Sequence, residues 1–430
     1  MILILYTVLS TVLLTLGFPA AWLLSLTGRR NLLKRFIPPS FPDDDDRRRV
    51  WIHAASVGES LIAFSMAGEI KRKYPDTFVF VSTNTATGLN RISGMNRTTP
   101  EPVVDMVSFA PVDNPLITKW FVKRLRPSVL IIVETEIWPW LVRSADSAGI
   151  PVVLINARMT SRSFRRYYTI RFAFRSIMTK FTLVCVQSRS YARRFHMLGV
   201  PLERIEILGN VKFDGLPEKA MYNSAAQRKA LGIPEDAHVI VAGSTRPGEE
   251  PVLFRSFRRI REPFPDTVLV CAPRHLNRLA EVEKILVEEK IPFIRRSSGA
   301  SFDADRDSVL LLDTMGELIG VFACADVAFV GGSLRNFGGH NPLEPAALGV
   351  PVLFGPYMEQ TGSKELLAGG AAMLVHDEDE IVEVVHRLFT DKELKERMSE
   401  AGPAVVSRFK GTLDRTLRMM ENRHIIQGIR

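Results

Sequence analysis

Short apolar runs alternate with longer amphipathic stretches along most of this chain, and the alternation limits the folds that are open to it. Residues 129–133 and 352–354 hold only aliphatic or aromatic side chains, which is typical of strands buried on both faces. Strands that alternate with helices form parallel sheets covered by helices. The pattern breaks at residues 213–232, where Gly215, Pro217 and a polar stretch intervene. We therefore predict an α/β protein with two doubly wound sheets that face one cleft.

The same alternation gives the expected boundaries. In the first series the predicted strands are residues 50–54, 78–83, 104–109, 129–133, 152–156, 183–187 and 205–208. In the second series they are residues 238–242, 267–272, 309–312, 327–330 and 352–354. Helices are expected between them, for example at residues 276–289 and 378–388. We expect one domain at residues 50–215, a second at 216–410, and a basic helix or tail at 411–430.

The N-terminal residues 1–28 carry no charged side chain. A helix of this length is about 40 Å long at ~1.5 Å per residue, which is enough to cross a bilayer. Basic residues follow within positions 29–35, and the positive-inside tendency then places the rest of the chain on the cytoplasmic side. We predict a single membrane anchor followed by a linker at 29–49. A cleaved signal is less favoured, because the basic start is missing. Insertion without full crossing is a further alternative.

Composition narrows the class of protein. A chain that is 46% hydrophobic and 24% charged is globular rather than disordered. Cys185, Cys271 and Cys324 lie far apart in apolar runs, so we expect buried thiols in a reducing compartment and no metal cluster. Lys and Arg total 56 against 47 for Asp and Glu, a net charge of +9. This excess predicts an anionic partner, whether phospholipid, phosphorylated substrate or nucleic acid.

Polar residues follow the first predicted strand, where ligands of open parallel sheets bind. Ser56, Gly58 and Glu59 stand there, and Ser56 and Glu59 have the spacing of a capping box. Glu59 is therefore either a helix cap or a general base that takes the proton of an attacking hydroxyl. Gly58 would leave room for that acceptor.

Two further strand ends in the first half carry charge. Glu134 follows residues 129–133, and it either supports the reaction or bonds loop amides. Lys212 follows residues 205–208, and it either meets negative charge on a leaving phosphate or pairs with Asp214.

The second half repeats this arrangement. Ser244, Thr245 and Arg246 form a strand-to-helix turn that suits phosphate, although the chain contains no Walker A sequence. A cation follows the next strand in the run Pro273, Arg274. The residues after the strand at 309–312 are candidates to contact a base or ribose through their main chain; they are Met315, Gly316 and Glu317.

A glycine-rich segment at residues 331–345 joins a buried strand to a helix start, which suits the phosphate of a nucleotide sugar. Gly339 and His340 precede Asn341, the predicted N-cap, and Pro342, the predicted first helical residue. Leu343 and Glu344 follow. Glu344 either holds ribose hydroxyls or reaches back to the Asn341 N–H as a cap.

Five segments in this order resemble the lipid A Kdo transferases (3-deoxy-D-manno-octulosonic acid transferases). They are residues 53–59 (HAASVGE), 134–139 (ETEIWP), 209–214 (GNVKFD), 272–275 (APRH) and 339–345 (GHNPLEP). The resemblance covers nearly the whole chain. It implies a GT-B glycosyltransferase fold with an acceptor domain first and a CMP-sugar domain second. It also implies a place at the cell inner membrane, with the catalytic domains on its cytoplasmic face.

The resemblance implies inverting transfer of Kdo from CMP-Kdo to a lipid A precursor (lipid IVA) in lipopolysaccharide core biosynthesis. Glu59 matches the family's base, and Glu134 and Lys212 match positions that support the transition state. The matched CMP contacts are Pro273, Arg274, Met315, Gly316, Glu317, Asn341, Pro342, Leu343 and Glu344. Candidate phosphate or loop contacts are Ser56, Gly58, Ser244, Thr245, Arg246, Gly339 and His340. No metal, cofactor or nucleic acid is implied; membrane phospholipid is an expected partner.

Basic and aromatic residues mix in residues 158–180, and this mixture suits a membrane interface or the phosphates of a lipid. Arg162, Arg165 and Arg166 are the candidate acceptor contacts. The alternative is a solvated helix with aromatics in the core. Two other functions also compete with Kdo transfer: a GT-B transferase that uses a different nucleotide sugar, and a membrane-tethered protein that only binds nucleotide or nucleic acid.

Overall fold

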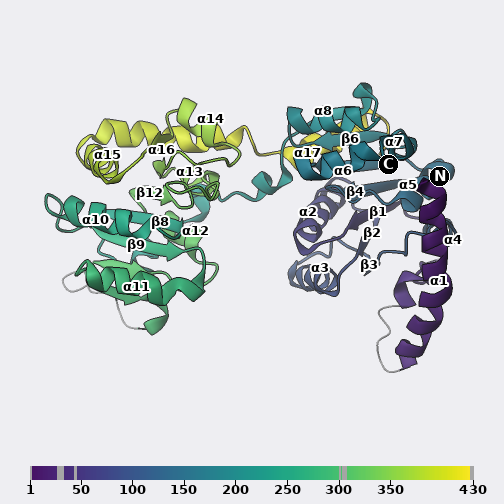
Figure 1. Ribbon diagram of the computed structural model, residues 1–430, viewed down its shortest axis with the longest axis horizontal. Coiled ribbons are helices and arrows are strands. Elements are labelled where there is room, and N and C mark those ends of the chain that lie inside the picture. The colour runs from purple at the N-terminus through teal and green to yellow at the C-terminus, as the bar shows by residue number, and fades with distance from the viewer. Residues whose placement is uncertain (1, 27–32, 43–45, 300–301, 303–307, 427–430) are drawn as a thin grey trace. The chain divides into compact units, whose positions relative to one another are not determined.

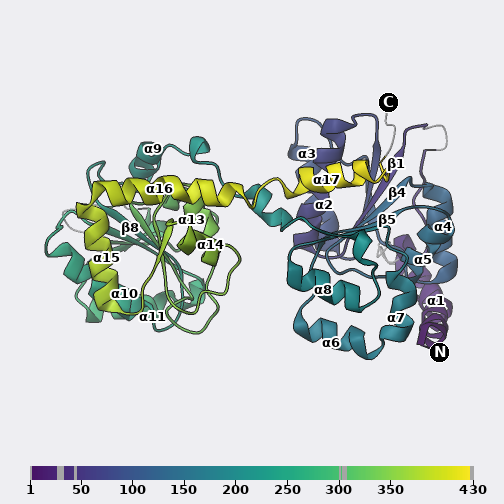
Figure 2. The same cartoon turned by 90° about the horizontal axis from the view of Figure 1, so that it is seen from above.

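The computed structural model describes residues 2–26, 33–42, 46–299, 302 and 308–426. The chain forms two compact units, one of residues 1–214 with 411–430 and the other of residues 215–410. In each unit a parallel sheet lies between layers of helices (Figures 1 and 2). The two parallel sheets confirm the predicted α/β fold class.

The sheet of the first unit has the order β3-β2-β1-β4-β5-β6-β7, and all of its neighbouring strands are parallel. Its strands are β1 (Arg49–Ala54), β2 (Phe78–Thr83), β3 (Met106–Phe109), β4 (Val129–Val133), β5 (Val152–Ala157), β6 (Leu183–Val186) and β7 (Ile205–Ile207). Its helices are α1 (Ile2–Leu26), α2 (Val57–Lys73), α3 (Ala86–Thr98), α4 (Pro115–Leu125), α5 (Pro139–Ser147), α6 (Ser161–Thr169), α7 (Arg171–Met178), α8 (Arg189–Met197) and α17 (Thr412–Asn422). Because the order reverses beside β1, the ends of β1 and β4 are the expected place for a ligand.

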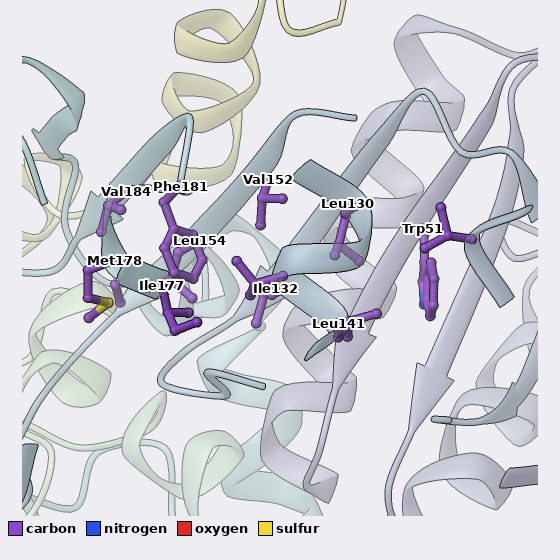
Figure 3. Close-up of a cluster of buried hydrophobic side chains, with 14 of the residues drawn as sticks. Trp51, Leu130, Ile132, Leu141, Val152, Leu154, Ile177, Met178, Phe181 and Val184 are labelled. Carbon is purple, nitrogen blue, oxygen red and sulfur yellow. The ribbon is translucent and has the colours of Figure 1, made fainter. Parts of the chain in front are cut away.

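Alternate residues of β1, β2, β4, β5 and β6 enter two different buried clusters, one on each face of the sheet. Figure 3 shows the first cluster, in which Trp51, Leu130 and Val152 of the strands meet Leu141 of α5 and Ile177 of α7. A strand with only apolar residues can pack against both clusters at once. For this reason the continuous apolar runs in the sequence could be identified as strands.

The predicted tail at residues 411–430 contributes a helix to the first unit. Leu417 and Met420 of α17 join the buried cluster that α2 covers, and Lys73 Nζ of α2 lies 2.6 Å from Glu421 Oε2. The chain therefore returns to its first unit after completing the second. Residues 427–430 lie outside the described part.

The sheet of the second unit has the order β10-β11-β9-β8-β12-β13-β14 and is also parallel throughout. Its strands are β8 (Val239–Thr245), β9 (Val268–Pro273), β10 (Phe293–Arg295), β11 (Val309–Leu311), β12 (Val327–Val330), β13 (Val352–Phe354) and β14 (Ala372–Leu374). Its helices are α9 (Ser224–Leu231), α10 (Glu250–Arg261), α11 (Leu279–Glu288), α12 (Leu318–Phe322), α13 (Leu343–Ala347), α14 (Ser363–Ala368), α15 (Glu378–Thr390) and α16 (Lys392–Ser407). The order reverses beside β8, so the ends of β8 and β12 are the matching place for a ligand.

The N-terminal helix α1 rests on the first unit through polar and aromatic contacts. The Tyr6 hydroxyl donates to Asp113 Oδ2 at 2.7 Å, Asn114 Nδ2 donates to Thr11 Oγ1 at 3.3 Å, and the Phe18 and Phe36 rings meet edge to face. No helix within residues 2–26, 33–42, 46–299 and 308–426 has the length and hydrophobicity of a membrane span, so the crossing anchor predicted for residues 1–28 is not supported. Residues 1, 27 and 28 of that prediction lie outside the described residues.

Candidate active site

Glu59 lies in the first turn of α2, at the carboxyl end of β1, and its side chain is buried. Its Oε2 accepts the Ala55 N–H at 2.8 Å and its Oε1 accepts the Ser56 hydroxyl at 2.8 Å. The Glu59 N–H donates in return to Ser56 Oγ at 3.3 Å, so Ser56 caps the helix as the capping-box spacing predicts, while the carboxylate takes the Ala55 N–H in place of the Ser56 N–H. These bonds fix the carboxylate in one position. A Cβ added at Gly58 would meet no atom within 4 Å, so space remains beside the acid.

Glu134 follows β4 with φ at 59°, a left-handed conformation that is uncommon outside glycine and that turns its buried side chain at the strand end. Arg158 Nε donates to Glu134 Oε2 at 2.7 Å, and Lys212 Nζ lies 3.9 Å from Glu134 Oε1. Residues that follow β4, β5 and β7 thus meet around one carboxylate. The structure brings the predicted pair of Glu134 and Lys212 together and adds Arg158 to it.

Asn156 explains why the segment after β7 reaches Glu134. Its φ is 52°, and the pairing of β5 with β6 shifts register between Leu154 and Ala157. This bulge directs the Asn156 side chain so that its Oδ1 accepts the Val211 N–H at 3.0 Å, while its Nδ2 lies 3.5 Å from Glu134 Oε1.

The alternative prediction, an ion pair between Lys212 and Asp214, is wrong. Asp214 accepts the amide hydrogens of Thr412 and Leu413 at 2.9 and 2.7 Å, which caps the start of α17 instead. The Lys212 side chain is half-exposed and forms an ion pair with Glu134.

A third acid, Glu136, lies close to the first two. Burial raises the pKa of Glu136, the Trp138 indole N–H bonded to it at 2.9 Å lowers that pKa, and the charges of Glu59 and Glu134 raise it. Trp138 meets the buried His53 edge to face at 6.0 Å between ring centres. Burial lowers the pKa of His53 to about 4, so this ring is neutral at neutral pH. The first unit therefore gathers three carboxylates beside a neutral, aromatic wall.

In the second unit, the end of β8 carries the predicted basic turn. Ser244 has φ at 58° and Thr245 is fully buried, and the Thr245 carbonyl accepts the Arg274 N–H at 3.1 Å. Arg246 Nη1 lies 2.6 Å from His275 Nε2. The buried Arg246 Nε has no hydrogen-bond partner within the described ranges. The ends of β8 and β9 therefore form one basic cluster.

Glu249, which the sequence reasoning did not select, holds the glycine-rich loop in place. Its fully buried carboxylate accepts the amide hydrogens of Gly332, Ser333 and Leu334 at 2.7 to 2.9 Å. It also accepts the Arg246 N–H at 2.9 Å. Burial raises the pKa of Glu249, and these four amide bonds lower it. One carboxylate thus joins the turn after β8 to the loop after β12.

The glycine-rich loop places His340 beside the basic cluster. Burial lowers the pKa of His340 to about 4, with further lowering by the charges of Arg246, Arg274 and His275. Its buried Nε2 finds no hydrogen-bond partner in the described part of the chain. Gly339 has φ at 70°, and a Cβ there would lie 2.4 Å from the Met358 sulfur, so this position requires glycine.

The helix after this loop begins one residue later than predicted. Pro342 is its N-cap and Leu343 its first residue. Asn341 still caps the helix start with its side chain, because Asn341 Oδ1 accepts the Leu343 N–H at 3.1 Å. Glu344 does not reach back to the Asn341 main chain; its Oε1 accepts the Asn341 side-chain amide at 3.0 Å. Burial raises the pKa of Glu344, and the charge of Arg274 lowers it, so Arg274 lies within electrostatic reach.

Met315, Gly316 and Glu317 follow β11, which pairs with β9 and so ends at the same edge of the sheet. Gly316 has φ at 90°, and the Met315 side chain is exposed. Glu317 Oε2 accepts a bond from the Thr314 hydroxyl and lies 3.4 Å from Arg296 Nε, and the Thr314 bond is the main reason that its pKa is lowered. Within the described residues, these three make no hydrogen bond or ion pair with Arg274.

The candidate acceptor residues Arg162, Arg165 and Arg166 lie on the exposed side of α6. Phe164, Tyr167 and Tyr168 of the same helix pack against the buried cluster of Figure 3, so the helix has one aromatic and one basic face. The aromatic residues therefore pack in the core, as expected for a solvated helix. The exposed arginines leave a basic surface that could also contact a lipid or membrane.

Comparison with known proteins places the chain among glycosyltransferases. A family model for 3-deoxy-D-manno-octulosonic-acid transferase (kdotransferase) matches residues 30–215. The 3-deoxy-D-manno-octulosonic acid transferase of Haemophilus influenzae is 32% identical over 375 residues, which is 86% of each chain. The crystal structure of the C-terminal CMP-Kdo binding domain of WaaA from Acinetobacter baumannii is 31% identical, with a TM-score of 0.40, over 43% of this chain and 95% of that one.

A glycosyltransferase from Rickettsia africae is 12% identical, with a TM-score of 0.60, over 88% of this chain and 99% of that chain. This likeness shows the fold alone, an α/β fold of the GT-B type with two parallel sheets. The identity and coverage of the Haemophilus relative decide the family: the chain belongs to the 3-deoxy-D-manno-octulosonic acid transferases.

Proposed function

We propose that this protein transfers Kdo from CMP-Kdo to a hydroxyl of a lipid A precursor such as lipid IVA, an early step of lipopolysaccharide core synthesis. The observation that carries the proposal is the 32% identity with the Haemophilus transferase over 86% of both chains. It is supported by the carboxylates and cations that end the strands of both units. The proposal includes no metal ion, cofactor or nucleic acid.

In the proposed reaction, the acceptor oxygen attacks the anomeric carbon of Kdo as the bond from that carbon to the CMP phosphate breaks. Attack from the face opposite the leaving group inverts the anomeric centre. Glu59 takes the proton of the attacking hydroxyl, because its carboxylate is held at a strand end with open space at Gly58. Lys212, with Glu134 beside it, stabilises the negative charge that develops on the departing phosphate.

The second unit binds the nucleotide in this proposal. Arg246 Nε and His340 Nε2 are buried polar atoms without partners in the described chain, and an anionic phosphate would supply an acceptor for each that carries hydrogen. Arg274 adds positive charge at the same place. The carboxylate of Glu344 is available for ribose hydroxyls, and the main chain at residues 315–317 for the base.

We also propose that the protein works at the cytoplasmic face of the inner membrane. The exposed side of α1 carries Ile4, Leu5, Leu9 and Leu16, each more than half exposed. An apolar surface of this kind suits contact with phospholipid.

The direct test is incubation of purified protein with CMP-Kdo and a tetra-acylated lipid A precursor, followed by mass spectrometry of the lipid. We expect a product heavier by one or more Kdo units, together with release of CMP. A panel of UDP- and GDP-sugars supplies the control, and we expect none of these donors to be consumed. Consumption of another donor in place of CMP-Kdo would show a different transferase, and no turnover with any donor would favour a binding protein.

Charge reversal on α6 tests the acceptor surface. We expect Arg162→Glu with Arg165→Glu to raise the apparent KM for the lipid acceptor about tenfold, because two phosphate-attracting charges become repulsive. The KM for CMP-Kdo should not change. The matched control is the same double reversal at Arg189 and Arg193, which are exposed on α8. If the α6 and α8 double variants had the same KM for the lipid acceptor, the assignment of Arg162 and Arg165 as acceptor contacts would be wrong.

A further inference from the structure

An apolar pocket opens on the first unit beside the segment that contains Glu136. Its walls are formed by Tyr6 of α1, Trp138, Tyr167 of α6, and Ile170, Phe174 and Ile177 at α7. Phe174 and Ile177 are buried, and Ile177 belongs to the cluster drawn in Figure 3. The floor of the pocket is therefore continuous with the hydrophobic core.

The walls are held in place without a ligand. The Tyr6 hydroxyl is bonded to Asp113, whose carboxylate also accepts the amide hydrogens of Trp140 and Leu141 at 3.1 and 2.8 Å. The Tyr167 and Phe174 rings stack with centres 4.5 Å apart. Both views of the chain place the start of α1 beside α5 and α7 (Figures 1 and 2). A pocket with fixed walls is ready for a ligand, because little side-chain ordering remains to oppose binding.

The rim of the pocket joins it to the candidate active site. Glu136 and Thr135 are the polar lining residues, and Glu136 is bonded to the Trp138 indole. Trp138 of the pocket wall meets His53 near the carboxyl end of β1, where Glu59 lies, and Glu134 directly precedes Thr135. Both acids therefore lie near the pocket's polar side, and their charges act on Glu136. The Thr135 hydroxyl also donates to the Arg158 carbonyl, and Arg158 pairs with Glu134. One short segment therefore contacts the acids on one side and the apolar pocket on the other.

Helix α6 carries both the basic face and one residue of the pocket wall. Arg162, Arg165 and Arg166 are exposed, whereas Tyr167 lines the pocket. A ligand that fits this surface has an anionic group for the arginines, a hydroxyl for the acids and a hydrocarbon part for the pocket. A phosphorylated, acylated sugar combines all three.

We propose that this pocket receives one fatty acyl chain of the lipid acceptor and so orients the acceptor's sugar toward Glu59. The inference rests on the proposed function. It goes beyond it by assigning a position to one hydrocarbon chain. Methylene groups gain free energy when they leave water for an apolar wall, and a seated chain restricts the directions from which the sugar hydroxyl can approach.

A matched pair of variants on α7 tests the inference. Ala173 lines the pocket, and Ala173→Phe would fill it. Ser176 lies on the same helix with its side chain exposed, so Ser176→Phe adds the same ring outside the pocket. We expect Ala173→Phe to raise the KM for the acylated acceptor at least tenfold in detergent solution. Ser176→Phe should leave it within about twofold, and neither variant should change the KM for CMP-Kdo.

A second measurement does not depend on the Ala173→Phe variant. An acceptor with a brominated acyl chain should quench the fluorescence of Trp138, which lies in the pocket wall. The quenching should be lost in Trp138→Phe while the signals of the other tryptophans persist. Quenching that is the same in Trp138→Phe would overturn the inference even if Ala173→Phe did not fold.

The outcomes separate the inference from the function on which it rests. If the wild-type enzyme adds Kdo and Ala173→Phe has an unchanged KM for acceptor, the inference fails and the function stands. If Ala173→Phe instead loses binding to phosphatidylglycerol vesicles and keeps its KM for acceptor, the pocket takes a bilayer lipid and the inference fails. Absence of Kdo transfer by the wild-type enzyme would overturn both.

Discussion

Glu59→Gln should lower kcat for Kdo transfer by about 10² to 10⁴, the range that a positioned general base contributes. The amide cannot take the proton of the acceptor hydroxyl at neutral pH. It can keep the local structure, because its oxygen can accept the Ala55 N–H and its NH₂ group can donate to the Ser56 hydroxyl. Calorimetric titration should show unchanged affinity for CMP, and the unfolding free energy should change by about 1 kcal/mol or less.

The chain offers a matched control for the competing interpretation of Glu59 as a cap only. Glu380 has the same position at the start of α15, where its Oε2 accepts the His376 N–H at 2.9 Å and its own N–H donates to Asp377 at 3.1 Å. It differs from Glu59 in a further contact, since the His376 ring nitrogen lies 2.8 Å from the same oxygen. Glu380→Gln should cost similar stability and leave kcat unchanged. If Glu59→Gln keeps full kcat, or if both variants lose kcat equally, Glu59 is a structural cap and the base must be sought elsewhere.

Much of the fold could be predicted because strands such as β4 and β13 are buried on both faces. The residues of β4 and β13 are aliphatic or aromatic throughout, and both strands begin and end at the predicted residues. The missed strands β10 and β14 are three residues long and partly exposed, so they carry neither a long apolar run nor a clear alternation. The position of α17 was not predictable from local pattern, because its apolar residues pack against α2, more than three hundred residues earlier in the sequence.

The candidate site shows a similar division. The residues that end strands were found from the topology of parallel sheets, and Glu134 and Lys212 do lie together. Arg158, Asn156 and Glu249 were missed because they act through long-range contacts. Glu249 appears in the sequence as one of two adjacent glutamates at a helix start, and only the folded chain shows it accepting amides from residues 332–334.

Lys212→Met should lower kcat about 10²- to 10³-fold, the usual loss when one preorganised donor to a developing negative charge is removed. Methionine keeps much of the length of the side chain and deletes its charge. The backbone should stay in place, because the Lys212 N–H is bonded to Asn210 Oδ1 at 3.0 Å. The KM for CMP-Kdo should rise less than the kcat falls, since this interaction strengthens as the phosphate departs. Steady-state kinetics with both substrates varied would separate the two parameters.

Asp214→Asn is the control for a structural explanation of that loss. Asp214 receives the Thr412 and Leu413 amides, and asparagine retains one oxygen acceptor, so the variant should lose roughly 1 kcal/mol of unfolding free energy. Its kcat should remain that of the wild type, because the contact of Lys212 with Glu134 does not involve Asp214. If Asp214→Asn reproduced the kcat loss of Lys212→Met, the segment after β7 would support the reaction by positioning α17, and the charge of Lys212 would not be the cause of the loss. A selective loss in Lys212→Met would instead tie the ammonium group to phosphate departure, since the two variants disturb the same five-residue turn and only one removes its cation.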